Sequence, residues 1–199
     1  MNITLRRTLA LGSAIAAAAA LTACTINIGT GNDPYGDHMN DGGMMHQSDS
    51  AIGTMDLMFA QMMIPHHEQA IVMSDLILET TTNPDIRALA EQIKGAQAPE
   101  IEQMKGWLDD ANTSHQMDHD MGMDGMLSAS EMAELEAATG VERDRLFLEG
   151  MIAHHEGAIQ MADMIIDSQN AEARALADAI VTGQTAEIAT MTALLSALG

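Results

Sequence analysis

Residues 63–73 read Met-Ile-Pro-His-His-Glu-Gln-Ala-Ile-Val-Met, and residues 151–161 read Met-Ile-Ala-His-His-Glu-Gly-Ala-Ile-Gln-Met. The two stretches share the pattern M-I-x-H-H-E-x-A-I-x-M at an offset of 88 residues (151 − 63). Such self-similarity indicates two copies of one structural unit. Neither copy is close to a glycine-rich loop or a cysteine cluster, so the motif itself is the candidate site.

The apolar residues around each copy recur at spacings of three and four, which is the pattern of a bundle helix. The first copy predicts a helix over 54–78, and the second predicts a helix over about 142–167. The first buried face contains Asp56, Phe59, Met63, His66, Ala70, Met73 and Ile77. The second contains Asp144, Phe147, Met151, His154, Ala158, Met161 and Ile165.

Each of these helices is followed by a second helix that is also repeated. Asn83-Pro84-Asp85 supplies an N-cap, a proline at the first helical position and a first-turn acid. The corresponding helix near the C-terminus spans 171–198. Four residues match at an offset of 87 (184 − 97): Gln97, Glu100, Ile101 and Met104 correspond to Gln184, Glu187, Ile188 and Met191. Ser128 and Glu131 form a capping-box pattern for a short helix between the copies.

These elements predict an all-α fold. One helical hairpin cannot bury its own apolar stripe, whereas two hairpins can close into a four-helix bundle with an approximate two-fold axis. We therefore expect a four-helix bundle built from two repeated hairpins, plus one short helix. The predicted organisation is a signal peptide over 1–23, a flexible Met/His-containing tether over 24–50 and a helical domain over 51–199. Within this domain we expect repeat 1 over 54–110, a Met/His-rich linker over 111–127 and repeat 2 over 128–199.

The N-terminal segment predicts export. Two arginines precede a short apolar run, and Leu21-Thr22-Ala23-Cys24 follows. This arrangement is typical of a secretory signal, and the last four residues resemble a bacterial lipobox. We expect lipidation of Cys24 to anchor the protein to the bacterial membrane, with the helical domain on the extracytoplasmic side.

Composition narrows the function classes. Cys24 is the one cysteine, so neither an intrachain disulfide nor a thiolate metal site within the domain is available. The formal net charge is −21, which argues against nucleic-acid binding because the phosphate backbone requires Lys and Arg. The same charge would raise the local concentration of cations. The chain also has 19 methionines, some of them in the polar tether and linker, where they have no packing role.

The histidine pairs are the candidate metal site. An imidazole in an apolar core is costly unless it is hydrogen-bonded or binds a metal ion. Imidazole together with thioether favours copper, especially Cu(I), and zinc bound with Glu68 or Glu156 is the next candidate. The predicted metal ligands are Met63, His66, His67, Met73, Met151, His154, His155 and Met161.

Other interpretations stay open at this point. The histidines could be structural, in a metal-free interaction protein of the cell envelope. An enzyme ranks last, since no nucleophile and general base form a recognisable set. Glu-x-x-His and His-Glu-x-x-His spacings are absent from the sequence, while a haem held by His and Met is not ruled out. The sequence leaves a homo-oligomer or a copper-transfer partner undecided.

The motif also resembles a known family. The sequence resembles the family of the domain of unknown function 305 at Phe59, Met62 to His67, Ala70-Ile71, Met73 and the second copy from Met151 to Ala158. The resemblance covers residues 51–199. It implies a ferritin-like helical bundle that is usually exported, and some members are copper-binding proteins linked to copper tolerance. Gly150 stands where the first copy has Met62, so the two halves need not bind metal equally.

Overall fold

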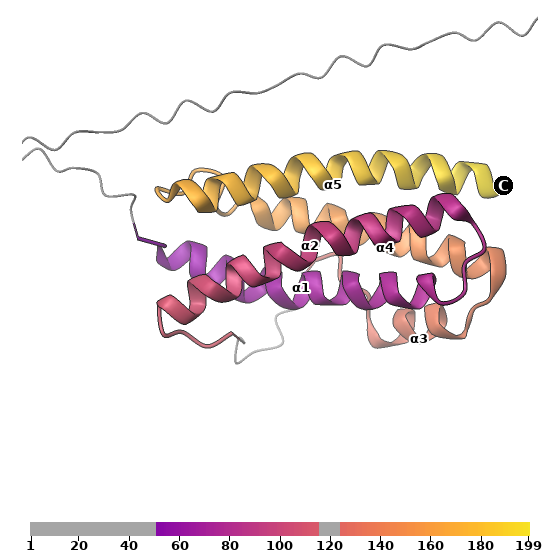
Figure 1. Ribbon diagram of the computed structural model, residues 1–199, viewed down its shortest axis with the longest axis horizontal. Coiled ribbons are helices and arrows are strands. Elements are labelled where there is room, and N and C mark those ends of the chain that lie inside the picture. Colours follow the sequence, from indigo (N-terminus) through magenta and orange to yellow (C-terminus); the bar gives the residue numbers. More distant parts are fainter. Residues whose placement is uncertain (1–50, 116–123) are drawn as a thin grey trace, which may run out of the picture. The chain divides into compact units, whose positions relative to one another are not determined.

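The computed structural model describes residues 51–115 and 124–199, and these residues form helices without any strand. The helices are α1 (Thr54–Leu78), α2 (Pro84–Asp110), α3 (Ala129–Ala137), α4 (Gly140–Ala162) and α5 (Ala171–Leu198) (Figure 1). The predicted all-α fold is therefore confirmed. The predicted signal peptide, Cys24 anchor and tether lie outside the described residues, as does part of the linker.

The helix starts follow their capping residues. The Asn83 side chain accepts hydrogen bonds from the first backbone N–H groups of α2, and Asn170 does the same for α5. Ser128 and Glu131 form the capping box of α3. Because these side chains satisfy N–H groups that have no partner within the helix, they define where each helix begins. The predicted starts of α2, α3 and α5 are confirmed.

The end of α4 differs from the prediction. The apolar spacing predicts helix to about residue 167, but α4 ends at Ala162. The backbone N–H groups of Met164 and Ile165 donate to carbonyls three residues back, so the chain tightens into turns. Ile165 is nevertheless fully buried. Its burial explains why the apolar spacing continues beyond the helix.

The helices pair as two hairpins. α1 packs against α2 and α4 packs against α5, while the hairpins meet chiefly through α1 and α4 (Figure 1). The described residues thus contain the two predicted hairpins and the short α3. Their arrangement as a ferritin-like four-helix bundle stays a prediction. Within the described ranges, no helix combines the length and hydropathy needed to cross a membrane.

Two apolar clusters form the core. The first core cluster joins the first half of α1 to the second half of α4. The second core cluster joins the second half of α1 to the first half of α4. The two helices therefore run in opposite directions. Buried members of the first are Phe59, Ala60, Met63, Ile64, Ile101, Met104, Trp107, Leu108, Ala158, Met161, Ala162, Ile165, Ala173, Leu176, Ala177 and Ile180. Buried members of the second are Ala70, Met73, Ile77, Ile86, Leu89, Ala90, Ile93, Leu135, Phe147, Leu148, Met151 and Met191.

Candidate metal centre

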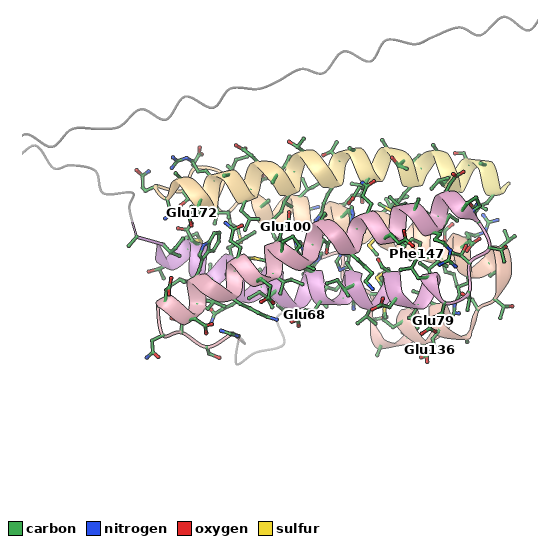
Figure 2. All side chains as sticks on the ribbon, viewed as in Figure 1. Glu68, Glu79, Glu100, Glu136, Phe147 and Glu172 are labelled. Atoms are coloured by element: carbon green, nitrogen blue, oxygen red, sulfur yellow. The ribbon has the colours of Figure 1, made fainter. Side chains whose placement is uncertain are left out.

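Polar side chains separate the two core clusters along all four long helices. Each helix contributes two such residues between its apolar segments. This central polar layer consists of His66, His67, Gln97, Glu100, His154, His155, Gln184 and Glu187. All are buried except Glu100, which is labelled in Figure 2 and whose side chain is 18% exposed. Buried polar groups are stable only when they are partnered, so the contacts of each member matter.

His66 and His154 meet where α1 packs against α4. Their ring centroids are 3.7 Å apart, and the ring planes are tilted by 43°. Both residues are completely buried. His66 Nε2 lies 3.3 Å from the carbonyl oxygen of Asp124, whereas His66 Nδ1 and both ring nitrogens of His154 have no hydrogen-bond partner. An unsatisfied buried polar group costs about 1–3 kcal/mol of folding stability, so this histidine pair destabilises the fold unless a ligand binds it.

Burial keeps both of these histidines neutral. Desolvation, together with the neighbouring His67, lowers the pKa of His66 from 6.5 to about 3. Desolvation, followed by the proximity of His66, lowers the pKa of His154 well below its usual value. A neutral imidazole keeps a lone pair on one ring nitrogen, and this is the form that binds metal ions. The pair is therefore in its metal-binding protonation state at neutral pH.

The second histidine of each copy is held by a carboxylate. His67 Nε2 lies 2.7 Å from Glu100 Oε2, and His155 Nε2 lies 2.7 Å from Glu187 Oε2. In both histidines Nδ1 has no partner. A metal-bound histidine commonly hydrogen-bonds a carboxylate through its other ring nitrogen. The same contact also satisfies one side of a structural histidine.

Two buried glutamines complete the layer. The side-chain oxygen and nitrogen of both Gln97 and Gln184 are buried without a hydrogen-bond partner. From the sequence alone, these glutamines, Glu100 and Glu187 had no predicted role in the site. Their recurrence at the offset of 87 was the signal that could have identified them, because polar residues repeated between apolar ones point to a shared buried role.

The predicted methionine ligands lie on both sides of the polar layer. Met63 and Met161 belong to the first core cluster, whereas Met73 and Met151 belong to the second. All four are at most 6% exposed. The eight predicted ligands are thus buried around the middle of the helices, with His66 and His154 as the contacting pair.

The histidines do not form one compact polar cage. The ring centroids of His66 and His67 are 6.5 Å apart, and those of His154 and His155 are 6.4 Å apart. In residues 51–115 and 124–199, no group of three or more His, Asp or Glu side chains is arranged to hold a metal ion. Met63 and Met151 stand three residues before His66 and His154 in the helices, and imidazole with thioether suits soft ions such as Cu(I) better than hard ions.

Comparison with known proteins identifies related chains. The family model of the domain of unknown function 305 (DUF305) matches residues 56–195. The structure of a DUF305 protein from Streptomyces coelicolor, provisionally described as secreted, is 33% identical, with a TM-score of 0.69 over 76% of this chain and 94% of that chain. A DUF305 fragment from Deinococcus radiodurans is 31% identical, with a TM-score of 0.69 over 74% of this chain and 99% of that chain.

CopM is also similar to this chain. Its Cu(II)-bound form is 30% identical, with a TM-score of 0.63 over 72% of this chain and 97% of that chain. Its Cu(I)-bound form is 31% identical, with a TM-score of 0.60 over 71% of this chain and 95% of that chain. Silver-bound structures of CopM match as well. No curated protein matches the chain.

Proposed function

Because the chain belongs to the DUF305 family and buries a contacting pair of neutral histidines, we propose that it binds copper in its central polar layer. It would do so as an exported protein that sequesters the metal or passes it on. The observation that carries this proposal is the contact of His66 with His154, in which three of four ring nitrogens are buried without a partner. A bound metal ion would accept the lone pair of one nitrogen from each ring and would offset part of the cost of burying the pair.

The proposed ligand set combines imidazoles with thioethers. His66 and His154 would supply the imidazoles, and the core methionines of α1 and α4 would supply the thioethers (Met63, Met73, Met151 and Met161). His67 and His155 are further candidates through Nδ1, since Nε2 is held by a carboxylate. This mixed soft set favours copper over zinc, which prefers several nitrogen, oxygen or thiolate ligands. CopM, which has been crystallised with Cu(I), Cu(II) and silver, supports the choice.

The cellular setting is part of the same proposal. The Arg6-Arg7 start, the apolar run and Cys24 favour export with a lipid anchor. The Met and His residues of the tether and of the linker would act as accessory capture sites of lower affinity. The helices would then close as a ferritin-like four-helix bundle around the polar layer.

A second candidate function is a metal-free structural or interaction protein. The bonds from His67 to Glu100 and from His155 to Glu187 favour it, because a carboxylate partner satisfies part of the hydrogen-bonding capacity of a structural histidine. It leaves the unpartnered nitrogens of His66 and His154 without an explanation.

A Cu(I) competition experiment separates the two candidates. The chain from residue 24 onward would carry Cys24→Ser, which removes a thiol that would itself bind Cu(I). Its Cu(I) affinity is measured against a chromogenic chelator, and thermal unfolding is followed in parallel. We compare it with the same chain carrying His66→Leu and His154→Leu, which keep volume but remove the ring nitrogens. Gln160→Leu is the control, because Gln160 is exposed on α4 and lies outside both the polar layer and the linker.

Copper binding in the polar layer predicts a tight site that the double variant loses and the control keeps. A ligand that binds only the folded state at about 100 times its Kd stabilises the fold by about 2.7 kcal/mol. The metal-free alternative predicts equal Cu(I) affinity in all three chains, since the remaining binding would come from the tether and the linker. That result would refute the proposed function.

A further inference from the structure

Gly150 and Gly157 of the second copy and Gln69 of the first contact one segment, the strap, which consists of residues Asp124–Leu127. At an offset of 88, Met62 corresponds to Gly150 and Gln69 corresponds to Gly157. The strap precedes α3 in the chain, approaches α4 at Gly157 and is hydrogen-bonded to α1 through Gln69. The internal symmetry of the helices is therefore broken where the strap crosses them.

Close approach to α4 requires glycine on both sides of the contact. A Cβ atom added to Gly157 would collide with the Asp124 carbonyl oxygen. Gly125 has a φ of +87°, and a Cβ atom there would lie 2.5 Å from the Ala153 carbonyl oxygen. Gly150 leaves room for the Leu127 side chain, which would lie 3.1 Å from an added Cβ atom. Gly157 and Gly125 thus allow backbone to lie directly on backbone.

The first copy holds the strap through side-chain hydrogen bonds. Gln69 Nε2 donates to the Leu127 carbonyl oxygen at 2.9 Å, and Gln69 Oε1 accepts from the Leu127 N–H at 2.8 Å. One side chain thus satisfies both backbone polar groups of Leu127, in the manner of a strand pair. Gln69 on α1 and Gly157 on α4 occupy the same position of the motif. Gln69 hydrogen-bonds the strap, and Gly157 leaves room for it.

One backbone carbonyl of the strap contacts a buried histidine. The Asp124 carbonyl oxygen lies 3.3 Å from His66 Nε2. A carbonyl oxygen only accepts hydrogen bonds, so this contact requires that His66 carry its proton on Nε2. The lone pair of the neutral ring is then on Nδ1, the atom that has no protein partner. Metal-bound histidines commonly donate a hydrogen bond from one ring nitrogen to a backbone carbonyl and bind the metal through the other.

From these contacts we propose that the strap fixes His66 as a ligand that binds metal through Nδ1, with Gln69 and Gly157 as the positioning residues that hold the strap. The inference rests on the proposed function and names the ligating atom within it. His154 has no partner on either nitrogen, so the strap distinguishes the two central histidines although their sequence motifs match.

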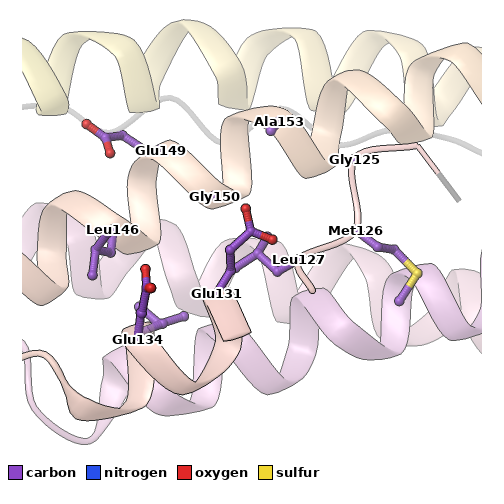
Figure 3. A pocket seen from close by; sticks show the side chains of 10 residues that line it. Gly125, Met126, Leu127, Glu131, Glu134, Leu146, Glu149, Gly150 and Ala153 are labelled. Carbon is purple, nitrogen blue, oxygen red and sulfur yellow. The ribbon is translucent and has the colours of Figure 1, made fainter. Parts of the chain in front are cut away.

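A pocket borders the strap and leaves space for it to move. Its cavity of about 340 Å³ lies between α3, α4 and residues 125–127 of the strap (Figure 3). Glu134 and Glu149 line it, and carboxylates raise the local concentration of cations. Displacement of the strap would separate the Asp124 carbonyl oxygen from His66 Nε2. Weakening the strap should therefore change both the tautomer of His66 and its metal affinity.

The test uses 15N-histidine NMR of the Cys24→Ser chain from residue 24 onward, metal-free and with Cu(I). Long-range 1H–15N correlations report which ring nitrogen of His66 carries the proton. The variants are Gln69→Ala, which removes both bonds to Leu127, and Gly157→Ala, whose Cβ atom displaces Asp124. Their matched controls are Gln160→Ala, on the exposed side of α4, and Gly183→Ala, where an added Cβ atom meets nothing within 4 Å.

We expect an Nε2–H tautomer in the metal-free protein and a Cu(I)-induced change at Nδ1. Both strap variants should show a mixed tautomer population and bind Cu(I) about 10-fold to 100-fold more weakly, which is the usual effect of losing a group that orients a ligand. The controls should behave as the parent chain. Gln69→Ala keeps the test decisive if Gly157→Ala does not fold.

Two failures are distinguishable. If the parent chain binds Cu(I) but His66 carries its proton on Nδ1, or binds copper through Nε2, the strap proposal alone is overturned. The strap proposal is also overturned if the Gln69→Ala variant has the same His66 tautomer and the same Cu(I) affinity as the parent chain. If the parent chain shows the Nε2–H tautomer and binds no Cu(I), the proposed function fails, and the ligand role of Nδ1 fails with it.

Discussion

His155 Nε2 donates a hydrogen bond to the Glu187 carboxylate at 2.7 Å, and both side chains are at least 95% buried. The equivalent contact of the first repeat joins His67 to Glu100 at the same distance, but the Glu100 side chain is 18% exposed. The two halves therefore make one interaction in two environments. Glu187 Oε1 also accepts a hydrogen bond from Gln92 Nε2 at 3.0 Å, so both burial and this second bond set the Glu187 carboxylate apart from that of Glu100.

Removal of these carboxylates should destabilise the fold unequally. Glu187→Leu leaves His155 Nε2 buried without a partner, and we expect a loss of about 1.5–3 kcal/mol in the free energy of unfolding. Glu100→Leu should cost less, because water can reach the site. Urea denaturation measures both values. Glu187→Gln and Glu100→Gln are the controls, since an amide keeps a hydrogen-bond acceptor. Equal losses in the two Leu variants would contradict the interpretation.

Acid should weaken the metal-free fold through the central histidines. Burial lowers the pKa of His66 to about 3 from 6.5, so the unfolded chain binds more protons between these values. The free energy of unfolding must then fall as the pH falls below about 6.5, by about 1.4 kcal/mol per pH unit for each such group. The pKa of His154 shifts in the same direction.

Substitution of His66 isolates this effect from that of the carboxylates. His66→Leu should lose about 2–3 kcal/mol less stability than the parent between pH 7 and pH 4.5. His115→Leu serves as the control for a histidine outside the core. Denaturation curves at both pH values give the comparison. Parallel losses in the parent and His66→Leu would show that the folded protein protonates His66 as readily as the unfolded chain.

Copper binding at the central pair should resist mild acid. Protons compete with metal for imidazole only near or below its pKa in the folded protein, and the pKa of His66 is about 3. We expect the Cu(I) affinity of the parent chain to change by less than about threefold between pH 7 and pH 5.5, a range that lies above this pKa. Competition titrations at the two pH values check this. A fall matching protonation near pH 6.5 would place the tight site on exposed histidines instead.

The buried methionines should divide into ligands and packing residues. Met→Leu preserves volume and usually costs less than about 1.5 kcal/mol, but it removes the thioether. Met63→Leu, Met73→Leu, Met151→Leu and Met161→Leu are compared with Met104→Leu and Met191→Leu, which are equally buried on α2 and α5. Loss of Cu(I) affinity with stability retained identifies a ligand. Identical affinities in all six variants would leave the thioethers with a packing role only.

The amino-acid sequence by itself determined the helices and their duplication. Spacing of three and four residues shows which side of a helix is apolar, and caps such as Asn83 and Ser128 act within a few residues of the chain. Local signals of this kind need no knowledge of the partner helix. The same spacing extended α4 too far, because Ile165 packs into the core from a turn.

Only the tertiary structure decided which polar side chains meet. Glu100 is 33 residues from His67, and Asp124 is 58 residues from His66. No periodicity connects such positions, since a helix pattern indicates the buried face but not what lies opposite it. The sequence shows that the two copies differ at Met62 and Gly150, but only the tertiary structure shows that the strap places a backbone carbonyl on His66.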